Sequence, residues 1–218
     1  MSETIVFLGP TLDLATARSC LDATYLPPIK RGDLAQIPSQ TRIVGIIDGD
    51  FHQSLAVSPK EVLALLDRGV TVCGASSIGA LRAAETHREG MIGVGAIFEM
   101  YRDGTIDADD EVAVAYCPTT HQAISEPLVN IRFALRAAVA QGVILQSEAD
   151  EIIRTLKDIY FPSRSYQLVA RMCPALDAFL RSKRYDKKRE DALLLLQTIA
   201  DLQGASALTR PCNGKKGN

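Results

Sequence analysis

The sequence predicts an α/β protein with a mainly parallel, doubly wound sheet and a C-terminal helical extension. Between residues 4 and 85, short apolar runs alternate with helical patterns, which is typical of βαβ units. The apolar runs show no polar alternation, which indicates strands buried on both faces. From residue 125 onward only helical periodicity remains. We therefore expect a core domain over 1–124, a helical region packed on it over 125–204, and a disordered tail over 205–218.

The individual elements follow from the same patterns and from their start and stop signals. Strands are expected at 4–8, 23–26, 42–47, 70–75 and 112–116. Helices are expected at 11–21, 58–68, 77–85, 94–101, 126–141, 147–160, 164–182 and 188–203. The second helix carries a capping box, with Ser58 as N-cap, Pro59 at the first position and Glu61 three residues after the cap.

Composition limits the classes of function. The 218 residues are 47% hydrophobic and 23% charged with a net charge of -2, which makes no electrostatic case for nucleic-acid or membrane binding. No apolar run reaches the roughly 20 residues of a spanning helix, and no secretion signal opens the chain. Five scattered cysteines without a CxxC pair argue against structural zinc and favour reduced thiols. We expect a cytoplasmic protein without a cofactor or metal.

A nucleotide cofactor is also disfavoured by the glycine pattern. Gly93 and Gly95 form a G-x-G pair, but no third glycine completes a dinucleotide fingerprint and no predicted strand precedes the pair.

The stretch from Val70 to Glu85 predicts a strand, a tight turn and a helix. Ser77 lies at the turn, with Ala75 two residues before it and Gly79 two residues after it, as in a nucleophile elbow. The helix N-terminus behind it offers free N–H groups that suit an oxyanion. The plainer interpretation is a helix N-cap. Because Ser76 is adjacent, the choice between the two hydroxyls stays open.

Acidic residues follow the neighbouring strand. On a parallel sheet the loops at 9–11, 48–54 and 74–79 share one edge, so Asp48, Asp50 and His52 can converge on Ser77 as a hydrolytic set. The alternative for this Asp-Gly stretch is a simple turn.

Two further charged groups have functional and plain interpretations. Arg31 can hold a carboxylate or phosphate, but it can equally pair with Asp33 or solvent. Asp110 and Glu111, in an acidic run before an expected strand, suit a divalent cation or a cationic group, whereas a solvated turn is the plainer explanation.

Several motifs taken together resemble the TfuA-like core domain over residues 4 to about 132. They are Gly9-Pro10-Thr11-Leu12, Pro27-Pro28 with Arg31-Gly32-Asp33, Ile47-Asp48-Gly49 with Phe51, Lys60-Glu61, Gly74 with Ser77 and Gly79 to Glu85, Gly90-Met91 with Gly93, Gly95 and Ile97-Phe98, and Asp109 to Ala113.

The resemblance implies a role beside a YcaO-family enzyme, which activates backbone amides and installs thioamides in ribosomally made peptides, including antibiotics, or in a methanogenesis enzyme. A TfuA-like member is expected to deliver sulfur by hydrolysing the C-terminal thiocarboxylate of a ubiquitin-like sulfur carrier. The precursor peptide is then only an indirect partner. Two alternatives stay open: a non-catalytic adaptor that docks carrier and YcaO enzyme through the C-terminal helices, and a generic serine esterase.

The resemblance also implies roles for the residues that carry it. Ser77 attacks the thiocarboxylate or supplies its turn's N–H groups, and Asp48 and Glu61 are the candidate orienting acids. The resemblance assigns no base; by position in the sequence alone, His52 is the first candidate, ahead of His87. Arg82 is expected to clamp the carrier's carboxyl end, with Glu85 on a similar helical face. The remaining carrier-binding candidates are Gly9, Pro10, Arg31, Asp33, Gly49, Ser76, Gly79, Asp110 and Glu111.

Overall fold

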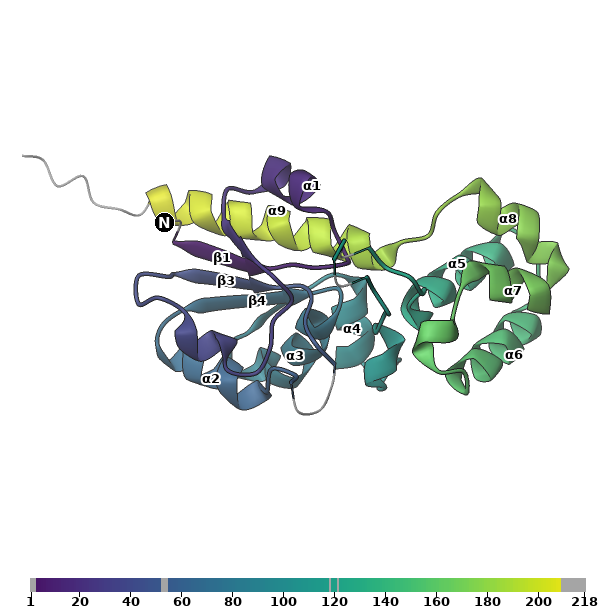
Figure 1. The fold of residues 1–218 in the computed structure, drawn as a ribbon, viewed down its shortest axis with the longest axis horizontal. Helices are drawn as coiled ribbons and strands as arrows, with labels where there is room; N and C mark the ends of the chain where they lie inside the picture. The colour runs from purple at the N-terminus through teal and green to yellow at the C-terminus, as the bar shows by residue number, and fades with distance from the viewer. Residues whose placement is uncertain (1–2, 52–54, 118, 121, 209–218) are drawn as a thin grey trace, which may run out of the picture.

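The computed structural model describes residues 3–51, 55–117, 119–120 and 122–208. A parallel sheet lies at its centre, with the strand order β2-β1-β3-β4-β5 (Figure 1). The strands are β1 (Thr4–Phe7), β2 (Thr24–Leu26), β3 (Ile43–Ile46), β4 (Thr71–Ala75) and β5 (Ile92–Val94). Every pairing is parallel, for instance Ile5 opposite Val44. The predicted α/β class is confirmed.

The first helices lie between the strands, and after the last strand all further elements that the structure describes are helical. The α-helices are α1 (Leu14–Cys20), α2 (Pro59–Asp67), α3 (Ile78–Thr86), α4 (Ala96–Arg102), α5 (Leu128–Ala140), α6 (Gln146–Lys157), α7 (Tyr166–Met172), α8 (Asp177–Ser182) and α9 (Lys187–Leu208). Short 3-10 turns are η1 (Asp33–Gln36), η2 (His87–Glu89), η3 (Asp109–Glu111), η4 (Phe161–Ser163) and η5 (Pro174–Leu176).

The sheet is covered on both faces because its side chains alternate and both sets are apolar. Ile5 and Phe7 of β1 pack into the core formed with α2, α3 and α4, whereas Val6 packs with α1 and α9. Figure 1 shows α9 lying along the whole face of the sheet, with α2 and α3 below it. Helix α9 approaches very closely, since a Cβ on Gly45 would lie 2.7 Å from Ile199 Cδ1.

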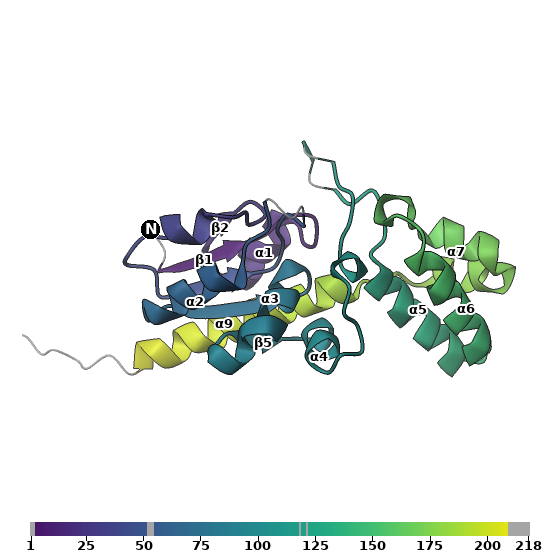
Figure 2. The same ribbon diagram turned by 90° about the horizontal axis from the view of Figure 1, so that it is seen from below.

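Helices α5 to α8 form a second body with its own apolar core. Both views place this body beyond one end of the sheet (Figures 1 and 2). Helix α9 leaves it and returns along the sheet, so the start of α9 lies where the two bodies meet. Among the described residues, no helix is long and apolar enough to cross a membrane.

One predicted strand is wrong and one strand was missed. The stretch 112–116 is not a strand; its apolar residues Val112 and Ala113 are buried because they run between the two bodies. The edge strand is instead β5, whose glycine obscured the pattern. A Cβ on Gly93 would lie 2.2 Å from the ring of Phe98, so the packing of α4 requires glycine there.

The C-terminal elements also differ from expectation. The stretch 164–182 is divided into α7 and α8 at Cys173 and Pro174. Helix α9 continues to Leu208, so residues 205–208 of the expected disordered tail are helical. The rest of that tail, 209–218, lies outside the described residues, and the proposed domain boundaries stay a prediction.

Two glycines let α3 pack directly on the strands that precede it. A Cβ on Gly79 would lie 1.8 Å from the carbonyl oxygen of Ile46, and one on Gly74 would lie 2.2 Å from the Gly79 carbonyl oxygen. The Gly79 N–H donates to Ile47 O at 3.3 Å. Backbone therefore rests on backbone at the start of α3, which sets the position of the turn before it.

We predict that Gly79→Ala lowers the free energy of unfolding by more than about 3 kcal/mol, because the backbone atoms it meets cannot move aside. Gly204→Ala in α9, where a Cβ would meet nothing within 4 Å, should instead raise it by about 0.5–1 kcal/mol. Urea unfolding of both variants measures the difference. A mild effect at Gly79, similar in size to that at Gly204, would contradict this packing.

Candidate functional site

The turn between β4 and α3 is strained. Ser76 has φ +69°, and it is the sole positive-φ residue other than glycine among the described residues. The Ser77 N–H donates to Ala75 O at 2.9 Å, which closes a three-residue turn of the rare positive-φ kind. The expected strand, sharp turn and helix are therefore present, and the residue with the strained backbone is Ser76.

The two serine hydroxyls have different surroundings. Ser76 Oγ is fully buried and has no hydrogen-bond partner among the described residues. Ser77 is the N-cap residue of α3, but its side chain makes no capping hydrogen bond. Its Oγ accepts a hydrogen bond from Lys188 Nζ at 3.1 Å. The simple N-cap interpretation therefore does not describe the Ser77 hydroxyl.

Lys188 reaches this turn from the first turn of α9. It is 3% exposed, and its ammonium also donates to Val112 O at 2.7 Å. Burial lowers the pKa of Lys188, while the charges of Asp48, Asp186 and Glu126 oppose the shift. A buried lysine with a lowered pKa that contacts a serine hydroxyl is a candidate general base.

Sequence reasoning missed Lys188. It lies in a highly charged run, Arg184 to Glu190, which is typical of a solvated helix start. Because Lys188 lies 111 residues after Ser77 in the sequence, no local pattern indicates that the two side chains meet.

Asp48, just after β3, links its own loop to the loop after β1 at this edge of the sheet. Its carboxylate accepts hydrogen bonds from the N–H groups of Gly9 and Thr11 at 2.9 and 3.1 Å, and from Thr11 Oγ1 at 2.6 Å. The loops after β1, β3 and β4 are thus brought together, with Lys188 between them. Asp48 is 2% exposed and acts on Lys188 through its charge.

A groove of about 1020 Å³ opens beside this edge, between the loop after β1, the end of β2 and the start of α9. A smaller cavity of about 30 Å³ borders Lys188. Both are lined by Pro10, Thr11 and Asp186. The larger groove therefore adjoins a space the size of one water molecule next to the candidate base. Ser77 itself is only 2% exposed.

Several candidates at the other end of this edge have structural partners. Glu61 completes the capping box of α2 and accepts from Gly32 N at 2.6 Å. Burial opposes ionisation of Glu61, but the hydrogen bonds from Ser58 and Gly32 outweigh it and lower its pKa. Asp33 accepts from Lys30 N at 2.7 Å, and Arg31 Nε donates to Ala56 O at 3.4 Å.

Two glycines also serve the close packing of this edge. A Cβ on Gly9 would lie 2.4 Å from Pro28 Cγ, and one on Gly49 would lie 2.5 Å from Ile29 Cγ2.

The expected carrier clamp on α3 is engaged within the protein. Arg82 is 9% exposed; its Nε donates to Val57 O at 2.7 Å and its guanidinium pairs with Glu85. Asp50 pairs with Lys30 at 3.6 Å. His52 lies outside the described residues.

Asp110 and Glu111 belong to η3, and each meets an arginine of the helical body. Asp110 pairs with Arg164 at 2.5 Å and Glu111 with Arg132 at 2.6 Å. Among the described residues, no three His, Cys, Asp or Glu side chains are grouped so that they could hold a metal ion. The cationic partners of this acidic turn are therefore the protein's own arginines.

We predict opposite effects of the two serines on stability. Ser76→Ala removes a buried hydroxyl without a described partner and should raise the free energy of unfolding by about 1 kcal/mol. Ser77→Ala removes a partner of the buried Lys188 and should lower it by about 1 kcal/mol. Denaturant unfolding at neutral pH measures both. A loss of stability in Ser76→Ala larger than that in Ser77→Ala would contradict these environments.

No curated protein matches the chain. A protein-family model described as TfuA-like protein matches residues 48–165, which is more than half of the 218 residues. The matched stretch begins at Asp48 and includes the strained turn, η3 and Arg164, while Lys188 lies beyond it. The chain belongs to the TfuA-like family, which is associated with YcaO thioamidation systems.

Proposed function

We propose that this protein releases sulfide by hydrolysing the C-terminal thiocarboxylate of a ubiquitin-like sulfur carrier, in support of a YcaO-family partner. The observation that carries the proposal is the contact of 3.1 Å between Lys188 Nζ and Ser77 Oγ. Thiocarboxylate hydrolysis is acyl transfer to water, and a serine activated by a buried amine is one of the known arrangements for that chemistry.

The proposed reaction has two halves. Neutral Lys188 accepts the proton of Ser77 Oγ while the oxygen attacks the carbonyl carbon of the thiocarboxyl group. The tetrahedral intermediate collapses with cleavage of the C–S bond, and the lysine proton leaves with sulfur as hydrosulfide (HS⁻). Water, activated by Lys188, then cleaves the ester on Ser77 and leaves a carboxylate on the carrier. The proton released in this second half protonates the hydrosulfide, so the net reaction is thiocarboxylate plus water giving carboxylate plus hydrogen sulfide.

The start of α3 supplies a place for the negative charge of the tetrahedral oxygen. The Ile78 N–H, first in the helix, has no acceptor in the described part of the chain. It follows Ser77 directly, which is where nucleophile elbows provide an oxyanion donor. The positive end of the α3 dipole adds to this stabilisation.

The groove offers an approach for the carrier's C-terminal chain end. It shares the walls at Pro10 and Thr11 with the cavity beside Lys188. Because this cavity holds about one water molecule, the reaction requires that binding of the carrier widens it. Asp48 holds Thr11 in that wall through two hydrogen bonds, so we assign Asp48 a positioning role.

We predict that Ser77→Ala and Lys188→Met each lower the rate of sulfide release by at least about a hundredfold, because each removes one member of the pair. Lys187→Met is the matched control, since Lys187 is the adjacent lysine on α9 and pairs with Glu190. Sulfide is measured after mixing protein with thiocarboxylated carrier. Release by Ser77→Ala at the parent rate would eliminate the nucleophile.

We predict that sulfide release increases with pH, because Lys188 acts only as the neutral amine. Burial lowers the pKa of Lys188 below its ordinary value of 10.5, so the midpoint of the increase should lie below 10.5. A pH profile of kcat measures it. A rate that falls as pH rises through this range would show that Lys188 acts in its charged form.

A non-catalytic adaptor is the second candidate, and the 2% exposure of Ser77 favours it. Against it, residues 164–182 contain no exposed large apolar side chain, and Leu194 is the single one over 188–203. Co-elution with carrier and YcaO enzyme, together with sulfide release no faster than background, would establish the adaptor instead.

A further inference from the structure

The Lys188 ammonium depends on a carbonyl group whose position is set from outside the sheet. Val112 O accepts from Lys188 Nζ at 2.7 Å, which is shorter than the contact to Ser77 at 3.1 Å. Val112 follows η3 directly and is not part of a strand. The sheet ladder therefore does not fix this carbonyl, and another interaction must hold it.

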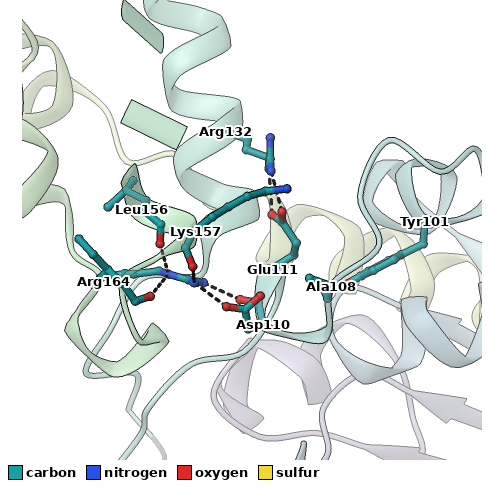
Figure 3. A network of polar contacts seen from close by, with 9 residues as sticks. Tyr101, Ala108, Asp110, Glu111, Arg132, Leu156, Lys157 and Arg164 are labelled. Atoms are coloured by element: carbon teal, nitrogen blue, oxygen red, sulfur yellow. Dashed lines mark hydrogen bonds and ion pairs between the residues drawn. The ribbon is translucent and has the colours of Figure 1, made fainter. Parts of the chain in front are cut away.

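That interaction is a buried ion pair to helix α5. Glu111, the last residue of η3, is fully buried, and Arg132 donates to its two oxygens at 2.9 and 2.6 Å. Figure 3 shows the Arg132 side chain extending from its helix to meet the Glu111 carboxylate in this paired arrangement. Paired hydrogen bonds fix orientation as well as distance, because a guanidinium and a carboxylate are both planar.

Helix α5 also holds the backbone of Lys188. Asn130, two residues before Arg132 on α5, accepts from the Lys188 N–H at 3.2 Å through Oδ1. Its Nδ2 donates to Asp186 at 3.2 Å, just before α9 begins. Helix α5 of the C-terminal body thus bonds directly to the Lys188 backbone and is linked to the Lys188 ammonium through Glu111 and Val112.

We propose that Arg132 is a positioning residue, which through Glu111 fixes the Val112 carbonyl and so holds the Lys188 side chain against Ser77. The helical body then sets the geometry of the serine–lysine pair on the sheet. As far as this concerns catalysis, the inference rests on the proposed function. The placement of Lys188 is a separate claim and can be measured without substrate.

The neighbouring ion pair provides a matched control. Arg164 donates to the Asp110 carbonyl oxygen at 2.8 Å and to its carboxylate at 2.5 Å, and also to Leu156 O (Figure 3). It joins the same turn to the same helical body. Asp110→Asn removes its charge while the backbone contact from Arg164 remains, and the Glu111–Arg132 pair stays intact. If any weakening of the contact between η3 and the helical body released Lys188, the Asp110 variant would show the same effect as the Arg132 and Glu111 variants.

The experiment labels lysines of the folded full-length chain with acetic anhydride at pH 8 and measures acetylation of Lys188 by peptide mass spectrometry. The variants are Arg132→Lys, the charge-neutral double variant Arg132→Gln with Glu111→Gln, and Asp110→Asn. Circular dichroism confirms that each is folded, and the double variant avoids leaving Glu111 charged and unpaired. We expect at least tenfold faster labelling of Lys188 in the double variant, an intermediate rate in Arg132→Lys, and less than a twofold change in Asp110→Asn.

Sulfide release gives the second readout. The double variant should lose at least tenfold in kcat with KM unchanged within twofold, since the groove is untouched. Parental labelling of Lys188 in the folded double variant, or equal acceleration in Asp110→Asn, would overturn the inference. If the parent protein releases no sulfide but the labelling pattern holds, the proposed function fails and the positioning of Lys188 stands.

Discussion

The structure depends on one unfavourable placement, an amine buried at the edge of a parallel sheet. Lys188 is 3% exposed and satisfies its ammonium with a serine hydroxyl and a backbone carbonyl, and no carboxylate of the described residues contacts it directly. Burying such a group is costly, and burial correspondingly lowers its pKa. Proteins retain strained and poorly satisfied groups mainly where function requires them. Ser76, with φ +69° and a buried hydroxyl without a described partner, lies in the same turn.

The fold explains how this placement is maintained. The turn cannot move closer to the sheet, because Gly79 already rests on the backbone of β3. Helix α9 cannot slide, because Asp191, one turn after Lys188, accepts from the Ile97 N–H at 2.8 Å at the start of α4. Burial raises the pKa of Asp191 to about 6. The helical body adds the third constraint through α5. The core of the sheet, the helical body and helix α9 therefore all help to hold the contact between Lys188 and Ser77.

Local sequence signals predicted much of the fold and part of the site. The capping box at Ser58, the apolar strands and the glycine-spaced turn are all encoded within a few residues, and each is present. Asp48 at the end of β3 is also placed by strand order alone, since parallel strands bring their ends to one edge.

What sequence reasoning missed is non-local. Lys188 is separated from Ser77 by 111 residues and is buried only because α9 returns to the sheet. The sequence did not indicate that Asp110 and Glu111 pair with arginines, because Arg164 and Arg132 lie on later elements of the chain. The sequence left the choice between Ser76 and Ser77 open, and no local signal identified Ser76 as the residue with positive φ. The missed strand β5 is short and carries Gly93, which packing against Phe98 requires.

The most direct test of the central claim is a search for the ester between Ser77 and the carrier. The protein is mixed with thiocarboxylated carrier, quenched in acid within one turnover, and examined by intact and peptide mass spectrometry. The proposed mechanism predicts a covalent adduct on Ser77 with the mass of the carrier less hydrogen sulfide, absent in Ser77→Ala. Sulfide release at full rate with no adduct, or with an adduct on another residue, would contradict it.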